Sequence, residues 1–317
     1  MAADVRGVTE APIRAIMGPL ITLWIIWGST YMGIALMVKS MPPLLGSGTR
    51  FLTASLVLGT IVVLVKGPRA FQVTRSQVRG AAFMGVTILG ISIGILSLAE
   101  QYVPSGIAAL IVSAVPLWII FFRFRAGDRP SRMTLMGVGV GLIGLVLMLL
   151  PGGTEPINGA SSTQVALWSV AIACGSFCWA FFSWRSTKYE QPTEPLTTAV
   201  IQLAAAGFFL VFVGALIGER WDFSVITQQS WAGWIFLVLA SALAYGAFIW
   251  LINNAPMSLV ATYAYINPVV AVFLGLIILN EAITVDVVVG LSIVVGGVVL
   301  VVTGERRTRL QLDEQPQ

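Results

Sequence analysis

Residues 231–252 read WAGWIFLVLASALAYGAFIWLI and contain no Asp, Glu, Lys or Arg. A helix of this length rises far enough to cross about 30 Å of lipid hydrocarbon. Because lipid satisfies no backbone hydrogen bond, a segment that spans it must be helical. Working outward, comparable apolar segments predict an all-α membrane protein with ten transmembrane helices, near 17–38, 44–65, 79–99, 104–122, 133–150, 165–184, 196–218, 231–252, 257–278 and 286–303.

The composition of the 317 residues excludes a soluble domain and several kinds of enzyme. Hydrophobic residues make up 57% and charged residues 10% of the chain, whereas a soluble domain carries roughly 25% charged residues. There is no His, which excludes His-ligated metal sites, Ser-His-Asp hydrolysis and His proton relays. The phosphate-binding pattern GxxxxGK(S/T) is also missing. We therefore expect no cofactor, no metal and no catalytic residue.

The positive charges predict the orientation of the chain in the membrane. With ten spans, fifteen Lys and Arg residues fall on the side that holds the N-terminus, and only Lys39 and Arg220 fall on the other. Lys and Arg concentrate in cytoplasmic links. Both termini are therefore expected in the cytoplasm, as tails of residues 1–16 and 304–317, with the protein in the plasma (inner) membrane. The basic charge reports topology, so the expected partner is a lipid bilayer and not a nucleic acid.

The two halves of the chain repeat each other, as residues 17–150 and 165–303. Because each half holds five spans, an odd number, the second copy must cross the membrane in the inverted orientation. Such inverted repeats are common among secondary transporters. The repeat is seen when 152 is added to residue numbers, which takes Trp27, Pro43, Gln77, Pro104 and Pro116 to Trp179, Pro195, Gln229, Pro256 and Pro268.

Pro116 and Pro268 occupy matched positions within the fourth and ninth spans. Proline lacks a backbone N–H and bends a helix in its interior. The symmetry of the pair predicts two bends that open the protein on alternate faces around a fixed central site. The alternative is a pair of kinks without a role in transport, since proline is frequent in membrane helices.

Polar and aromatic side chains collect on a few spans and predict a substrate-binding cavity. Trp24, Trp27 and Tyr31 are three and four residues apart, so they share one face of the first helix. Unpaired polar groups well inside a span are costly, which favours a cavity there. An interfacial aromatic belt is the alternative for the aromatic residues. The predicted cavity residues are Trp24, Trp27, Tyr31, Ser92, Ser113, Trp179, Ser183, Tyr245, Tyr265 and Asn267.

Arg50 is the one unambiguous charge within a span. An unpaired charge at this depth costs several kcal/mol, so intramembrane ionisable residues point to function. Arg50 either receives a substrate carboxylate or pairs with Glu100, which ends the third span on the same outer side. The central part of each span lacks Asp and Glu. This pattern disfavours obligatory proton coupling through a central acid and favours a small amphipathic or zwitterionic solute.

Several stretches carry a family resemblance: WGSTY at 27–31, AEQ at 99–101 with PSGIAA at 104–109, ATYAYINPVV at 261–270, and NE at 280–281. In these motifs the chain resembles the EamA-type permeases of the drug/metabolite transporter superfamily, with two EamA repeats, and it is most similar to their YedA-like branch. The resemblance covers about residues 17–303. It implies ten helices, cytoplasmic termini and a central cavity, supported by the fifth and tenth spans.

These observations together predict a secondary transporter and not an enzyme. The resemblance implies export of amino acids, aromatic ones among them, or of related small metabolites by alternating access. The partner is then a small-molecule substrate, and because one chain already holds both repeats we expect a functional monomer. The alternatives are a multidrug or toxic-compound efflux carrier and a channel.

Overall fold

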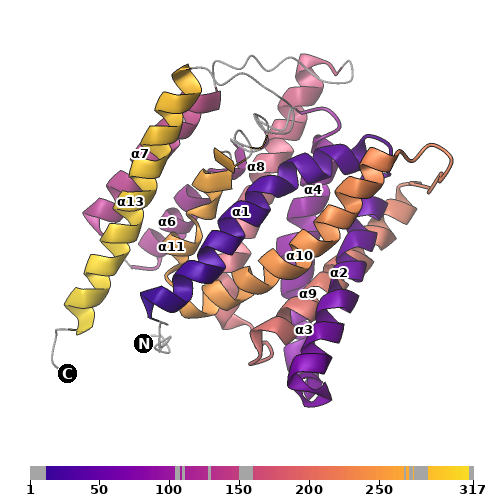
Figure 1. The fold of residues 1–317 in the computed structure, drawn as a ribbon, viewed down its shortest axis with the longest axis horizontal. Helices are drawn as coiled ribbons and strands as arrows, with labels where there is room; N and C mark the ends of the chain where they lie inside the picture. The colour runs from indigo at the N-terminus through magenta and orange to yellow at the C-terminus, as the bar shows by residue number, and fades with distance from the viewer. Residues whose placement is uncertain are drawn as a thin grey trace.

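The computed structural model describes residues 12–103, 108, 111–127, 130–149, 160–267, 269–270, 274 and 285–313. Within these ranges all regular structure is helical (Figure 1), so the predicted all-α class is confirmed. The elements are α1 (Ile13–Val38), α2 (Pro43–Lys66), η1 (Pro68–Phe71), α3 (Arg75–Met84), η2 (Gly85–Ile91), α4 (Ser92–Ala99), α6 (Val115–Arg125), α7 (Arg132–Leu149), α8 (Ser162–Arg185), η4 (Ser186–Lys188), α9 (Pro195–Leu216), α10 (Gln228–Asn254), α11 (Met257–Val260) and α13 (Val285–Asp313).

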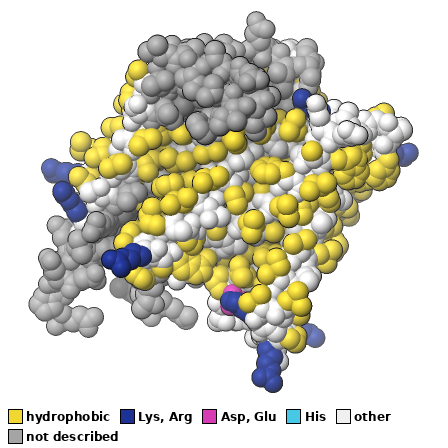
Figure 2. Space-filling view, in the orientation of Figure 1, with side chains coloured by type: hydrophobic (Ala, Val, Ile, Leu, Met, Phe, Trp, Pro, Cys, Tyr) yellow, Lys and Arg dark blue, Asp and Glu magenta, His cyan; other side chains and the backbone are white. Residues whose placement is uncertain are grey.

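Six described helices are long and apolar enough to cross a membrane: Ile13–Val38, Pro43–Lys66, Arg75–Ala99, Thr163–Lys188, Pro195–Leu216 and Gln228–Asn254. They make the chain a multi-pass membrane protein, as predicted. Hydrophobic side chains cover the broad middle of the face shown in Figure 2, and Lys and Arg side chains lie toward its edges. This distribution is the one expected of a surface that faces lipid in the middle and water at both ends.

The matched helices α2 and α9 begin and end for the same local reasons. Each begins at a proline, Pro43 or Pro195, in its first turn, where the missing N–H costs nothing. Each is followed by a glycine with positive φ, Gly67 at 78° and Gly218 at 86°, a conformation that stops a helix and that other residues rarely adopt.

Helices α2 and α9 pack side by side in antiparallel directions. At one end, backbone N–H groups of Leu44 and Leu45 donate to the Glu219 carboxylate at 3.1 and 2.8 Å. In the middle, Ser55 Oγ donates to the backbone oxygen of Val200 at 2.9 Å. At the other end, Lys66 Nζ lies 2.6 Å from Glu194 Oε2. Numbers rise along α2 as they fall along α9, so the two copies of this helix run in opposite directions.

Helices α7 and α13 form a second antiparallel pair, seen at one side of the bundle in Figure 1. A Cβ added to Gly137 would lie 2.7 Å from the backbone oxygen of Gly297, and one added to Gly144 would lie 2.8 Å from that of Gly290. Small residues therefore let the two backbones meet directly. In the rest of the bundle, α1 packs against α10, and η2 and α4 pack against α8.

The third long helix is interrupted by the π-helical segment η2, between α3 and α4. Its first residue, Gly85, lies so close to α9 that an added Cβ would be 2.3 Å from the backbone oxygen of Gln202. Segments of π-helix within an α-helix occur often at functional sites. The helix boundaries also extend the predicted spans, since α1 begins at Ile13 and α13 continues to Asp313.

Candidate functional site

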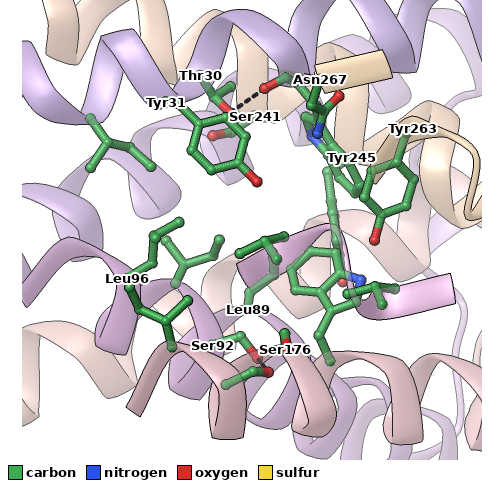
Figure 3. Close-up of a pocket in the computed structure, with 18 of the residues that line it drawn as sticks. Thr30, Tyr31, Leu89, Ser92, Leu96, Ser176, Ser241, Tyr245, Tyr263 and Asn267 are labelled. Atoms are coloured by element: carbon green, nitrogen blue, oxygen red, sulfur yellow. Dashed lines mark hydrogen bonds between the residues drawn. The ribbon is translucent and has the colours of Figure 1, made fainter. Parts of the chain in front are cut away.

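A cavity of about 90 Å³ lies between helices of the two repeats (Figure 3). Its wall comes from α1, α2, η2, α4, α6, α8, α10 and the helical segment that contains Tyr263 and Asn267. The described residues that line it are Trp27, Thr30, Tyr31, Ile34, Arg50, Phe51, Leu89, Ser92, Ile93, Leu96, Val112, Val115, Ile172, Gly175, Ser176, Trp179, Ser241, Tyr245, Tyr263 and Asn267.

The cavity is built from matched positions of the two copies. Trp27 and Trp179, which are 152 residues apart, both line it and contact each other. The same offset relates three further pairs in its wall: Leu89 and Ser241, Ile93 and Tyr245, and Val115 and Asn267. In these three pairs the first copy supplies an aliphatic residue and the second copy supplies a polar one. Equivalent positions of the two repeats therefore line the cavity, but their side chains differ in chemistry.

One end of the cavity is an aromatic cluster centred on Trp27. Its ring centroid lies 5.4 Å from that of Trp179 and 4.8 Å from that of Tyr263, both in edge-to-face geometry. Phe248 lies 5.0 Å from Trp27 and 5.6 Å from Trp179. These separations fall within the range preferred by aromatic pairs, so the rings support one another and hold a fixed apolar wall.

Arg50 brings a positive charge to the cavity wall. It is 3% exposed, its Nη1 donates to Ser241 Oγ at 3.0 Å, and its guanidinium carbon lies 4.3 Å from the centre of the Phe51 ring. Among the described lining residues it is the sole charged side chain. Glu100 is buried but lies outside the lining, and within the described residues no ion pair joins it to Arg50.

Neutral polar groups from opposite walls also face the cavity. In Figure 3, Tyr31 and Asn267 lie on one side, and Ser92 and Ser176 lie on the other. Ser92 Oγ donates to the backbone oxygen of Gly175 at 2.8 Å, so its hydroxyl is already partnered. Asn267 Oδ1 is buried and has no hydrogen-bond partner among the described residues. A bound solute can therefore donate a hydrogen bond to this amide oxygen.

Four predicted cavity residues lie elsewhere. Trp24 donates from Nε1 to Thr262 Oγ1 at 3.1 Å, and Ser113 and Ser183 are buried outside the lining. Tyr265 packs with Val138 and Val294, on the side of α7 and α13. Because residues two apart on a helix point about 200° apart, Tyr265 faces away when Tyr263 faces the cavity. Trp27, Tyr31, Ser92, Trp179, Tyr245 and Asn267 do line it.

Of the two prolines predicted to bend a helix, the structure describes one. Pro116 lies in the first turn of α6, which begins at Val115 after a turn at Ser113 and Ala114. Residues 111–112 before this turn are helical too, so helical structure is interrupted just before Pro116, whose missing N–H leaves the Val112 carbonyl without its helical partner; that this break opens the protein during transport stays a prediction. Pro268 lies outside the described residues.

Comparison with known proteins identifies the family. The chain matches the EamA-like transporter family over residues 16–150 and 166–303. The chain belongs to this family. It therefore carries two EamA repeats, as the sequence motifs indicated, and it is a membrane transporter whose family works on small molecules. The predicted resemblance is confirmed.

Two relatives of this EamA-family chain are named as transporters. It is 34% identical to the uncharacterized inner membrane transporter YedA of Escherichia coli K12, over 92% of this chain and 91% of the relative. It is 30% identical to the threonine/homoserine exporter RhtA of the same strain, over 84% and 85%. A solved crystal structure of a protein matches with a TM-score of 0.75 at 17% identity, covering 93% of this chain and 99% of that one, which shows the shared fold.

Several lining residues were not in the predicted set, among them Thr30, Phe51, Leu89, Ser241 and Tyr263. Ser241 precedes Tyr245 by four residues, so helical periodicity alone places it on the same face of α10. Phe51 and Leu89 are ordinary apolar residues of apolar spans, and their spacing carries no signal that separates a cavity wall from a packed core.

Proposed function

We propose that this EamA-family transporter is a secondary carrier of the inner membrane that exports small amino acids, or closely related zwitterionic metabolites, by alternating access. The observation that carries the proposal is the cavity between the two repeats, whose wall holds a buried guanidinium, an aromatic cluster and an amide oxygen that has no hydrogen-bond partner among the described residues. A relative named as a threonine/homoserine exporter supports the same substrate class.

The size of the cavity favours a small solute. A cavity of about 90 Å³ is several times the minimum of about 10–15 Å³ that one water molecule needs, so it has room for a few waters or a small solute. An aromatic amino acid is larger than threonine and fits this space less well.

The polar groups suit the two charges of an amino acid. Arg50 can donate to the carboxylate through the guanidinium N–H groups that do not bond Ser241, and hydrogen bonds to charged groups are the stronger kind. Asn267 Oδ1 can accept from the ammonium group. The rings of Trp27, Trp179 and Tyr263 then contact the carbon skeleton and offer their faces to the cation.

We also propose ten spans in two inverted repeats with both termini in the cytoplasm. The antiparallel course of α2 against α9 and of α7 against α13 supports the inversion, because each pair consists of matched helices. The excess of Lys and Arg on the N-terminal side supports the orientation. The repeat boundaries at 17–150 and 165–303 belong to the same proposal, as does a functional monomer, since one chain supplies both halves of the cavity wall.

Counterflow into liposomes that contain the purified protein tests this function. Vesicles are preloaded with one unlabelled amino acid, and uptake of labelled threonine is followed without an imposed ion gradient. Accelerated, saturable exchange is the expected result, and cationic drugs should compete poorly. Uptake that does not saturate would indicate a channel. Lack of exchange with every amino acid, together with exchange of cationic drugs by the same preparation, would replace amino acid export with drug efflux.

A further inference from the structure

Two side chains on one face of α10 are each held by a polar residue from a different helix. Ser241 accepts a hydrogen bond from Arg50 Nη1 of α2 at 3.0 Å. Tyr245, four residues later, donates from its hydroxyl to Gln202 Oε1 of α9. All four side chains are buried. Ser241 and Tyr245 line the cavity, so both bonds act directly on its wall.

Arg50 and Gln202 are equivalent residues of the two repeats, since 50 plus 152 is 202. Each lies seven residues after the proline that begins its helix, Pro43 or Pro195. Gln202 lies near the middle of the α2/α9 pair, since Val200, two residues earlier, bonds Ser55 there, and Arg50 lies nearer the end at which Glu219 caps α2. Under the proposed topology, Arg50 holds Ser241, the residue nearer the outer side of α10, and Gln202 holds Tyr245, one turn nearer the cytoplasm.

The bond at Gln202 continues to the cytoplasmic linker. Gln202 Nε2 donates to Gln191 Oε1 at 2.6 Å, and Gln191 Nε2 donates to the backbone oxygen of Ser186 at 3.0 Å. The backbone oxygen of Gln202 also lies against Gly85, the first residue of the π-helical segment η2. A polar chain thus runs from the cavity wall to the link between η4 and α9, beside an irregular helix segment that can act as a hinge.

We propose that Arg50–Ser241 and Gln202–Tyr245 are symmetry-related latches that close the cavity from the outer and the cytoplasmic side respectively. Gln202 is a positioning residue for transport, because it acts through Tyr245 and lies outside the cavity lining. Access alternates when one latch opens while the other holds. Ser241 and Tyr245 are about one helical turn apart on α10, so a tilt of this helix that pivots at one of the two residues keeps that bond and moves the other residue away from its partner.

The test uses a cysteine in the cavity as a reporter of access from each side. Cys174 and Cys178 are replaced by alanine, and Thr30→Cys provides the reporter in the cavity wall. A membrane-impermeant maleimide is added to right-side-out or to inside-out vesicles. The closed cavity is too small for the reagent, so the labelling rate reports the open fraction on that side. Tyr245→Phe and Gln202→Met remove the cytoplasmic latch, and Ser241→Ala removes the outer one.

The two sets of variants should change labelling in opposite directions. Tyr245→Phe and Gln202→Met should raise labelling from the cytoplasmic side about 2- to 10-fold and lower it from the outer side, since one buried hydrogen bond is lost. Ser241→Ala should do the reverse. The matched control Ser55→Ala also removes a buried bond between α2 and α9 but lies outside the cavity lining and bonds neither Ser241 nor Tyr245, so it should change neither rate.

Equal changes from both sides, or the same direction for both latches, would overturn the proposal and leave these bonds as ordinary packing contacts. Gln202→Met could fail to fold, in which case Tyr245→Phe, which removes a single oxygen atom, still decides the outcome. The inference rests on the proposed function only in requiring a carrier. Because labelling needs no substrate, its failure is separate from a failure of amino acid export, which counterflow measures.

Discussion

Replacing Arg50 by glutamine tests whether the cavity recognises a carboxylate. The substitution gives the first repeat the residue that the second repeat carries at Gln202, and it leaves a side chain that still donates a hydrogen bond. A hydrogen bond to a charged group contributes about 1.5–3 kcal/mol, and each 1.4 kcal/mol is a factor of ten in affinity. Arg50 is 3% exposed, so water screens the interaction little. We expect Arg50→Gln to raise the half-saturating amino acid concentration about 10- to 150-fold.

The assay compares amino acids with their methyl esters in liposome counterflow. The ester keeps the ammonium group and the carbon skeleton but has no carboxylate charge. Wild-type protein should prefer the free acid, and Arg50→Gln should remove this preference; because Arg50 also holds Ser241, exchange of both compounds can change, so the ratio of their half-saturating concentrations is the quantity compared. A matched loss for acid and ester would refute carboxylate recognition, because it would show that Arg50 supports the fold of the cavity and not the charge of the solute.

Three further predictions concern packing, the cavity wall and the surface. Gly297→Ala should be about 1–3 kcal/mol less stable than Gly296→Ala in detergent unfolding, since a Cβ at Gly297 meets the α7 backbone at 2.6 Å and one at Gly296 meets nothing within 4 Å. Equal stability of the two variants would contradict the close approach of α7 and α13. Trp27→Ala should weaken exchange strongly and Tyr265→Phe should leave it unchanged, because only the first side chain lines the cavity; counterflow with both variants decides this. Lys66→Met should cost less than about 1 kcal/mol, because the Lys66 side chain is 41% exposed, and a larger loss in the same unfolding assay would show that its ion pair anchors α2.

The residues on the first and ninth spans show which cavity residues helical periodicity predicts and which it does not. The spacing of Trp27 and Tyr31 placed both on one face, and both line the cavity. Tyr265 and Asn267 were predicted on a different ground, the cost of burying polar groups well inside a span, and of these two Asn267 lines the cavity, whereas Tyr263 lines it in place of Tyr265. Helical geometry fixes the angle between two residues of a helix, but not the rotation of that helix against its neighbours. That rotation decides which of Tyr263 and Tyr265 faces the cavity.

Arg50 and Glu100 show that the sequence does not determine the partner of a buried charged group. Their positions in the sequence allowed either a mutual ion pair or a free cation for the substrate. The structure turns Arg50 toward Ser241 and the cavity, and Glu100 stays buried outside the lining. Depth in the membrane follows from the sequence, whereas the choice of partner depends on how α2, α4 and α10 are packed together.

The sequence by itself determined the membrane class, the long apolar helices and the duplication. These follow from local rules, because hydropathy and a numerical offset between the repeats need no knowledge of neighbours in the fold. Only the tertiary structure decided that η2 is π-helical, that matched tryptophans meet, and that Gln202 bonds Tyr245. These depend on contacts between helices far apart in the chain, where the shapes of two packed surfaces, and not the spacing along either one, determine which side chains meet.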